Sequence, residues 1–172
     1  GGGILLDGSS NNTISGNNVM MNSGGIELSG SSNNIISGNN VTRGGIGLGS
    51  YSDRNIITAN KLIYHGLFID NSYMNIIENN TLNGKPIACY EDKSDLIVER
   101  DVGQVLFIRC NRMRVENLSI SNVDVPIMLE ATNNTILKGN NLTANGDGMW
   151  LSSSLNITVV GNHIANGDIC IE

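Results

Sequence analysis

A six-residue motif recurs along the first half of the chain at steps of 22, 21 and 20 residues. It occupies residues 14–19 (ISGNNV), 36–41 (ISGNNV), 57–62 (ITANKL) and 77–82 (IENNTL). A unit of this length is too short to bury its own apolar side chains, so it must stack on its neighbours. The repeat therefore predicts a solenoid, in which the outer faces and the ends carry the function.

Three sets of apolar residues recur in each repeat, and they predict three short strands. The first set consists of pairs separated by one residue, which is the alternation of a strand and not of a helix. It comprises Ile4/Leu6, Ile26/Leu28, Ile46/Leu48, Leu67/Ile69, Ile87/Cys89, Ile127/Leu129, Met149/Leu151 and Ile169/Ile171. The second set is Ile14, Ile36, Ile57, Ile77, Ile97, Val115, Leu137 and Val159, and the third is Val19, Val41, Leu62, Leu82, Val102, Ile120, Leu142 and Ile164. This pattern predicts an all-β fold, a parallel β-helix of about eight coils of 18–22 residues.

The coils are expected to form one domain over residues 1–172. Residues 1–83 and 123–172 carry regular coils, whereas the spacing is irregular over residues 84–122. In the irregular part, the first strand of the sixth coil has two candidate registers, with either Val105 and Phe107 or Leu106 and Ile108 pointing inward. Because the chain starts and stops inside a coil, we expect it to be part of a longer repeat protein.

Asparagine recurs at one position of the coil, just before the third strand. The residues are Asn17, Asn39, Asn60, Asn80, Asn140 and Asn162, and the series is interrupted at Arg100 and Leu118. Asparagine tolerates a left-handed turn conformation, and stacked amides can hydrogen-bond from coil to coil. These positions predict a structural asparagine ladder, whereas Asn145 is expected to lie in an exposed loop.

The charge balance argues against a nucleic-acid partner. Ten Lys and Arg residues stand against sixteen Asp and Glu residues, which gives a net charge of −6. An acidic chain repels phosphate backbones, and the basic residues between 93 and 114 are interleaved with acidic ones, as on a solvated surface. No apolar run approaches the length of a membrane span, so no membrane insertion by this segment is expected.

The three cysteines cannot all pair with one another. Cys89 is expected to point inward as a small apolar residue. A Cys89–Cys110 bridge requires that the register bring their Cα atoms within about 7 Å. Cys170 is expected to point outward from the last strand.

Seven Asn-X-Ser/Thr triplets occur in the chain, beginning at Asn11, Asn40, Asn79, Asn117, Asn133, Asn141 and Asn156. A repeat rich in Asn-Asn-Thr generates such triplets by itself. Asn40, Asn79 and Asn141 are nevertheless glycosylation candidates, because they are expected on exposed turns. The triplets favour an extracellular or cell-surface location.

The outward positions of the first strands form the most suggestive candidate binding surface. They are Leu5, Glu27, Gly47, Phe68, Ala88, then Leu106 or Phe107, and Met128, Trp150 and Cys170. From the fourth coil onward this column is apolar, where a solvated sheet face is usually polar. Phe68, Met128 and Trp150, with Asp70, Tyr90, Arg109 and Glu130 in the neighbouring column, are the predicted binding residues. The expected partner is protein, by self-stacking or by contact with flanking domains, or an extracellular polysaccharide.

Three acidic residues precede the first strands of the last coils, at Asp124, Asp147 and Asp168. Their offsets from the strand are three, two and one residues, so their carboxylates need not converge. Asn-Gly-Asp is also an ordinary turn sequence. The three residues are candidate Ca²⁺ ligands, since Ca²⁺ accepts loosely arranged loop oxygens, and no catalytic residue is assigned.

Several motifs resemble the NosD-type parallel β-helix repeats found in archaeal surface proteins. They are the Gly-Ile-X-Leu, Ser-Ser-Asn-Asn and Gly-Asn-Asn patterns, together with residues 84–87 (GKPI), 93–96 (KSDL), 103–105 (GQV) and 109–111 (RCN). Residues 112–118 are more basic than the corresponding block of relatives. The resemblance implies a right-handed, single-stranded β-helix of the pectate-lyase-like class, usually extracellular and often one module among several.

The family takes its name from a periplasmic protein involved in copper supply, and this resemblance raises the question of a copper site. Copper favours clustered His, Cys or Met. His65 and His163 are about four coils apart in the predicted repeat, and Met128 and Met149 are the only stacked Met pair, which suits apolar packing. No copper site is predicted, and no cofactor other than the candidate Ca²⁺ is expected.

Together these features favour a non-enzymatic, structural or adhesive β-helix module outside the cell. The first alternative is a polysaccharide-active enzyme of the pectate-lyase-like class, acting as a lyase, hydrolase or epimerase. The second is a periplasmic metal-maturation accessory of the NosD type. Adjacent coils lack an Asp-rich or Lys/Arg-rich catalytic constellation, and this favours the binding module over the enzyme.

Overall fold

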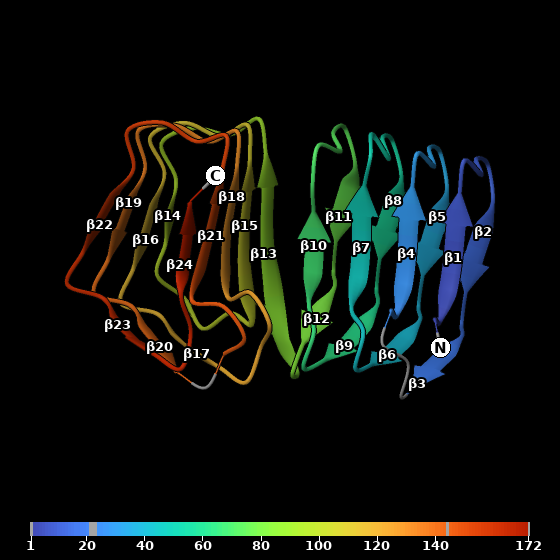
Figure 1. The fold of residues 1–172 in the computed structure, drawn as a ribbon, viewed down its shortest axis with the longest axis horizontal. Helices are drawn as coiled ribbons and strands as arrows, with labels where there is room; N and C mark the ends of the chain where they lie inside the picture. The colour runs from blue at the N-terminus through green and yellow to red at the C-terminus, as the bar shows by residue number, and fades with distance from the viewer. Residues whose placement is uncertain (1, 21–23, 144, 172) are drawn as a thin grey trace. The chain divides into compact units, whose positions relative to one another are not determined.

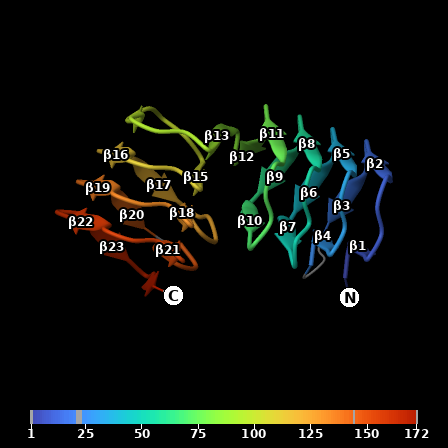
Figure 2. The same ribbon diagram turned by 90° about the horizontal axis from the view of Figure 1, so that it is seen from above.

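The computed structural model describes residues 2–20, 24–143 and 145–171. The chain divides into two compact units, an N-terminal unit (Gly1–Ile87) and a C-terminal unit (Ala88–Glu172). Each unit is a stack of β-coils, and Figures 1 and 2 show the strands of each coil lying beside the equivalent strands of the next. The all-β parallel solenoid predicted from the repeat is confirmed.

The N-terminal unit contains four coils of three strands each. The first strands are β1 (Ile4–Asp7), β4 (Ile26–Ser29), β7 (Ile46–Gly49) and β10 (Leu67–Ile69), and they form a parallel sheet in that order. The second strands are β2 (Thr13–Ser15), β5 (Ile35–Ser37), β8 (Ile56–Thr58) and β11 (Ile76–Glu78), and the third are β3 (Asn18–Met20), β6 (Asn40–Thr42), β9 (Lys61–Ile63) and β12 (Thr81–Leu82). Equivalent apolar residues stack in register, as in the pairs Ile26–Ile46 and Leu28–Leu48, and these four side chains are buried.

A β-hairpin ends the regular coils at residue 83. Strand β13 (Lys85–Glu91) runs antiparallel to β12, with Thr81 opposite Pro86 and Leu82 opposite Lys85. Both turn residues have positive φ, 52° at Asn83 and 79° at Gly84, which is the requirement of a two-residue type I′ turn. The Asn-Gly pair is a strong hairpin signal, whereas the repeat pattern of the coils does not predict this turn.

In the C-terminal unit, β13 lies beside β15 (Gln104–Ile108), followed by β18 (Ile127–Glu130), β21 (Met149–Ser152) and β24 (Ile169–Ile171). The second strands are β14 (Ile97–Val98), β16 (Arg114–Glu116), β19 (Ile136–Lys138) and β22 (Thr158–Val160), and the third are β17 (Ser119–Ser121), β20 (Asn141–Thr143) and β23 (His163–Ala165). The described residues thus hold seven complete three-strand coils, four in one unit and three in the other. The fifth coil has only two described strands, because Val102, the expected third-strand residue, lies outside any strand. The prediction of about eight coils therefore counted one coil that is incomplete.

Strand pairing settles the register that the sequence left open. Val105 pairs with Ile127 and Phe107 with Leu129, so Val105 and Phe107 point inward and Leu106 lies in the outward row. The amide of Asp92 donates to the carbonyl of Ile108 at 3.0 Å. In a parallel pair this bond sets Tyr90 opposite Phe107.

This register corrects the expected position of Cys89. The rings of Tyr90 and Phe107 pack with centroids 6.0 Å apart, which agrees with an inward Tyr90. Because side chains alternate along a strand, Cys89 shares the outward row with Leu106, and the prediction of an inward Cys89 is wrong. The hairpin accounts for the shift, since β13 enters its coil from an antiparallel turn and not from the usual coil corner.

The predicted asparagine ladder is present and largely buried. The Nδ2 atom of Asn17 donates to Oδ1 of Asn39 at 3.0 Å, and the same bond joins Asn39 to Asn60 and Asn60 to Asn80. Each Oδ1 also accepts a backbone amide of the preceding coil, as Asn60 does from Asn39 at 2.9 Å. Each asparagine side chain thus provides a hydrogen-bond partner for a backbone amide in a turn of the neighbouring coil.

Two further ladders of the N-terminal unit were not predicted. Asn12, Asn34, Asn55 and Asn75 form a second amide ladder before the second strands, and Ser9, Ser31, Ser52 and Ser72 form a hydroxyl ladder. Both series follow the same steps of 22, 21 and 20 residues, so the signal was available in the sequence.

In the C-terminal unit, Asn140 and Asn162 continue the predicted ladder, with Asn140 Nδ2 2.9 Å from Asn162 Oδ1. Asn145 is also a rung there, because its side chain bonds the amide of Val123 and the carbonyl of Ile120 at 3.2 Å each. Asn145 is 7 % exposed, so its expected place in an exposed loop is wrong.

Candidate functional site

A groove lies on the outer face of the first-strand sheet of the N-terminal unit. Leu5, Glu27, Gly47 and Phe68 occupy one row across β1, β4, β7 and β10, because each pairs with the next in register. The row two residues further along contains Ser29 on β4 and Gly49 on β7. Asp70 follows the end of β10, and its amide donates to the Leu48 carbonyl at 2.8 Å.

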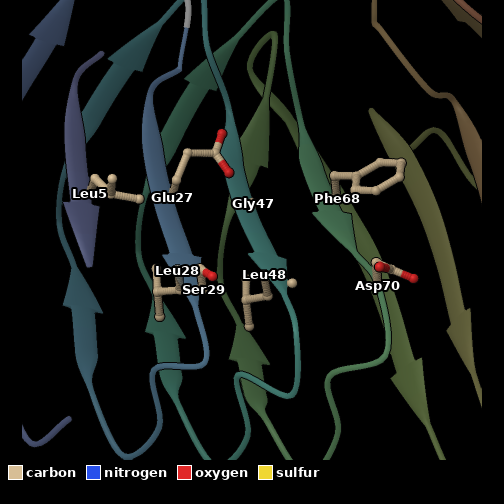
Figure 3. A pocket seen from close by; sticks show the side chains of 9 residues that line it. Leu5, Glu27, Leu28, Ser29, Gly47, Leu48, Phe68 and Asp70 are labelled. Atoms are coloured by element: carbon tan, nitrogen blue, oxygen red, sulfur yellow. The ribbon is translucent and has the colours of Figure 1, made fainter. Parts of the chain in front are cut away.

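Glycine makes the floor of this groove. Both outward positions of β7 are glycines, so this strand presents bare backbone between β4 and β10. A Cβ atom on Gly47 would lie 2.2 Å from Oε2 of Glu27, whereas one on Gly49 would meet nothing within 4 Å. The side chain of Glu27 therefore lies across the backbone of β7, as Figure 3 shows.

Apolar side chains flank the floor. The groove has a volume of about 400 Å³ and is lined by Leu5, Glu27, Leu28, Ser29, Gly47, Leu48, Gly49, Phe68 and Asp70. Leu5 is 68 % exposed at one side, and the half-buried ring of Phe68 projects from β10 at the other. Leu28 and Leu48 point into the core below the groove.

The only charged groups that line the groove are two carboxylates. Burial raises the pKa of Glu27 above its ordinary value, because the ionised form loses solvent. Among the described residues, none forms a hydrogen bond or ion pair with the Glu27 carboxylate. Asp70 accepts a hydrogen bond at 3.0 Å from Nδ2 of Asn71 and remains exposed. An apolar ring face beside hydrogen-bond acceptors is an arrangement that suits a polyhydroxylated ring.

Two predicted binding residues of the C-terminal unit lie in one outward row. Leu106 pairs with Met128, Met128 with Trp150, and Trp150 with Cys170. Trp150 and Cys170 are half-buried. Met128 is only 1 % exposed and Leu106 is fully buried, so both lack the exposure that the sequence led us to expect.

The predicted polar column beside this row is not assembled. Tyr90 points inward against Phe107. Arg109 forms ion pairs with Glu91, at 2.9 Å, and with Asp92. The residue opposite Glu130 is Ile108 and not Arg109, and Glu130 is buried.

The candidate Ca²⁺ ligands lie on successive turns of the C-terminal unit. The amide of Asp147 donates to the backbone carbonyl of Asp124, and the amide of Gly148 donates to the carbonyl of Asp168, each at 2.7 Å. Within residues 2–20, 24–143 and 145–171, no three His, Cys, Asp or Glu side chains are grouped so that they could hold a metal ion. The three turns that carry these aspartates are thus joined by backbone hydrogen bonds, and the carboxylates do not form a group that could hold a metal ion.

Cys89, Cys110 and Cys170 lie in the described part of the chain, and none of them forms a disulfide bond. The thiol of Cys110 donates to the carbonyl of Tyr90 at 3.3 Å. Burial raises the pKa of both Cys89 and Cys110, so neither is poised as a nucleophile.

The three glycosylation candidates are exposed. Asn79 occupies a turn with φ of 57°, as expected. Asn40 and Asn141 instead begin the third strands of their coils, so their expected position on turns is wrong while their exposure remains.

Comparison with known proteins identifies the family. Residues 1–98 match the model described as "Periplasmic copper-binding protein (NosD)", and residues 63–172 match the model described as "Right handed beta helix region". The fold and these matches define a right-handed parallel β-helix protein. The chain belongs to the NosD family.

The description of that family places its members in the periplasm, outside the cytoplasm. Neither the comparison with curated proteins nor that with solved structures gives a match. No helix among the described residues has the length and apolar character needed to cross a membrane.

Proposed function

We propose that this chain is a non-enzymatic, adhesive β-helix module that binds carbohydrate outside the cytoplasm, at the cell surface or in the extracellular space. The observation that carries the proposal is the glycine-floored groove, in which the carboxylate of Glu27 lies over Gly47 on β7 and the ring of Phe68 projects from the next strand, β10. Sugar rings stack on aromatic faces through their apolar C–H groups, while carboxylates accept their hydroxyl protons.

The backbone arrangement supports this role. The groove is built on strands whose inward residues are buried and stacked, so its geometry is fixed before a ligand arrives. A preorganised site avoids the entropy cost of ordering loops on binding.

The test is isothermal titration of the full chain against a panel of neutral, acidic and amino-sugar oligosaccharides. Phe68→Ala is expected to weaken binding of any captured oligosaccharide by about tenfold or more, because a stacked ring contributes at least that factor. Tyr64→Ala is the matched control, since Tyr64 is 48 % exposed, is aromatic and does not line the groove. Equal losses for the two variants would remove the groove from the proposal.

The same panel separates the rival functions. Release of reducing or unsaturated sugar ends, abolished by Glu27→Gln, would make the chain an enzyme and not a binding module. The NosD family description names copper, so titration with Cu²⁺ belongs in the same series. Binding of copper without binding of any sugar would favour a metal-maturation role.

A further inference from the structure

We propose that the groove selects an amino sugar with a free ammonium group, as found in a deacetylated hexosamine polymer. This inference rests on the proposed carbohydrate-binding function and names its substrate class.

The charge of the lining gives the first argument. Glu27 and Asp70 are the charged residues among the nine that line the groove, and both are acidic. The whole chain carries a net charge of −6. A uronate or sulfated sugar would therefore meet like charge at close range, whereas an ammonium group would meet opposite charge.

The position of Glu27 gives the second argument. Its carboxylate lies directly over the β7 backbone and is half-buried, and no described residue supplies a positive charge or a hydrogen bond to it. Ionising this group in the empty groove costs solvation energy. A bound ammonium would supply a counter-charge and up to three hydrogen-bond donors. Binding would therefore offset the solvation energy that the ionised Glu27 carboxylate loses in the groove.

The position of the carboxylate relative to Phe68 gives the third argument. Glu27 and Phe68 arise from β4 and β10, on either side of β7, and the Glu27 side chain reaches over Gly47 toward β10. The carboxylate therefore lies one strand spacing, about 5 Å, from the strand that carries the ring. The floor at Gly49 stays bare, since a Cβ atom there would meet nothing within 4 Å, so a sugar ring beside Phe68 can bring one amino substituent to Glu27.

The ring of Phe68 favours the same ligand. Aromatic faces attract both the C–H face of a sugar and a nearby cation. A lysine-rich peptide would satisfy the carboxylates, but it would gain little from a flat aromatic wall. The two ligands therefore differ in their dependence on Phe68.

The experiment compares three probes of equal length at about pH 6, where an ordinary amine is charged. The probes are fully deacetylated glucosamine oligomers, N-acetylglucosamine oligomers and oligolysine. We expect the deacetylated oligomer to bind at least about tenfold more tightly than the acetylated one. Glu27→Gln is expected to remove that preference, and Glu78→Gln, an exposed acidic residue on β11, is expected to keep it.

Each outcome has a distinct meaning. Equal affinity for the acetylated and deacetylated oligomers would overturn the amino-sugar inference and leave the proposed carbohydrate function standing. Failure of every sugar to bind would overturn both. Oligolysine binding as tight as that of the deacetylated oligomer, and unaffected by Phe68→Ala, would show that charge alone attracts the ligand and would also overturn the inference. Thermal melting of each variant shows whether a loss of affinity arises at the groove or from unfolding of the protein.

Discussion

The carboxylate of Glu27 lies over the α-carbon of Gly47, so close that a methyl group on residue 47 would stand 2.2 Å from Oε2. These residues are neighbours on adjacent strands, and they pair in register. The absence of a side chain on one strand therefore defines where the acidic side chain of the next strand can lie.

Replacing this glycine should close the groove while keeping the fold. In Gly47→Ala the new methyl group displaces the far end of the flexible Glu27 side chain, so we expect a small change in melting temperature and about a tenfold loss of ligand affinity. Gly2→Ala is the control, because its methyl group meets nothing within 4 Å and Gly2 does not line the groove. Titration of both variants checks the prediction, which fails if they lose affinity equally.

Glu27 should make stability depend on pH in a defined direction. Desolvation raises the folded-state pKa of Glu27, so the folded protein holds this proton more tightly than the unfolded chain. The contribution to stability is then fully present below the unfolded pKa, about 4.3, and is lost as pH rises through the folded pKa.

Glu27→Gln, which is neutral at every pH, should therefore melt at a higher temperature than the wild type at neutral pH. The difference should shrink below about pH 4. Glu78→Gln serves as the control, since Glu78 is exposed. Melting curves at both pH values test the sign, and a lower melting temperature for Glu27→Gln at neutral pH would contradict it.

Loss of a ladder rung should cost far more than loss of a surface amide. Asn60 is fully buried, and its Nδ2 atom donates to the Ile36 carbonyl at 2.9 Å as well as to Asn80. Asn60→Ala leaves these partners and the Asn39 amide unsatisfied, so we expect a destabilisation of about 1–3 kcal/mol. Asn40→Ala is the control, because Asn40 is exposed and makes one side-chain bond of 3.3 Å to Asn18. Chemical denaturation that gives equal values for the two would rule out an energetic role for the ladder.

The hairpin turn should depend on glycine for its backbone conformation and not for space. Gly84 has φ of 79°, and a Cβ atom there would meet nothing within 4 Å. Gly84→Ala should therefore destabilise the protein by about 1 kcal/mol through backbone strain alone. Gly49→Ala, which has space and no such φ, is the comparison in the same denaturation series, and an unchanged stability for Gly84→Ala would show that the turn relaxes.

The coils could be predicted from sequence because each strand repeats its apolar alternation at the same phase. Val41 and Leu62 are equivalent in spacing and also in the structure. The ladder was predictable for the same reason. Residues after the Asn83–Gly84 hairpin departed from expectation, since β13 enters its coil from an antiparallel turn and sets Tyr90, not Cys89, against Phe107.

The groove was harder to predict than the coils. The sequence placed Leu5, Glu27, Gly47 and Phe68 in one column, but it drew attention to the apolar residues that follow Phe68. Recognising the site requires knowing that the Glu27 side chain leans across a neighbouring strand, which depends on three paired strands at once. Two glycines at alternate positions of β7 were the available signal.

Every amide-to-amide bond of the Asn17–Asn80 ladder points the same way, with Nδ2 of one coil donating to Oδ1 of the next. In these bonds the asparagine of each coil accepts from the coil before it and donates to the coil after it. Duplicating or deleting a whole coil within the ladder would therefore leave every remaining amide donor matched with an amide acceptor. The arrangement of Glu27, Gly47 and Phe68 has no such tolerance, because it needs three particular coils in one order. Loss of a single repeat would thus leave a sound scaffold without its groove.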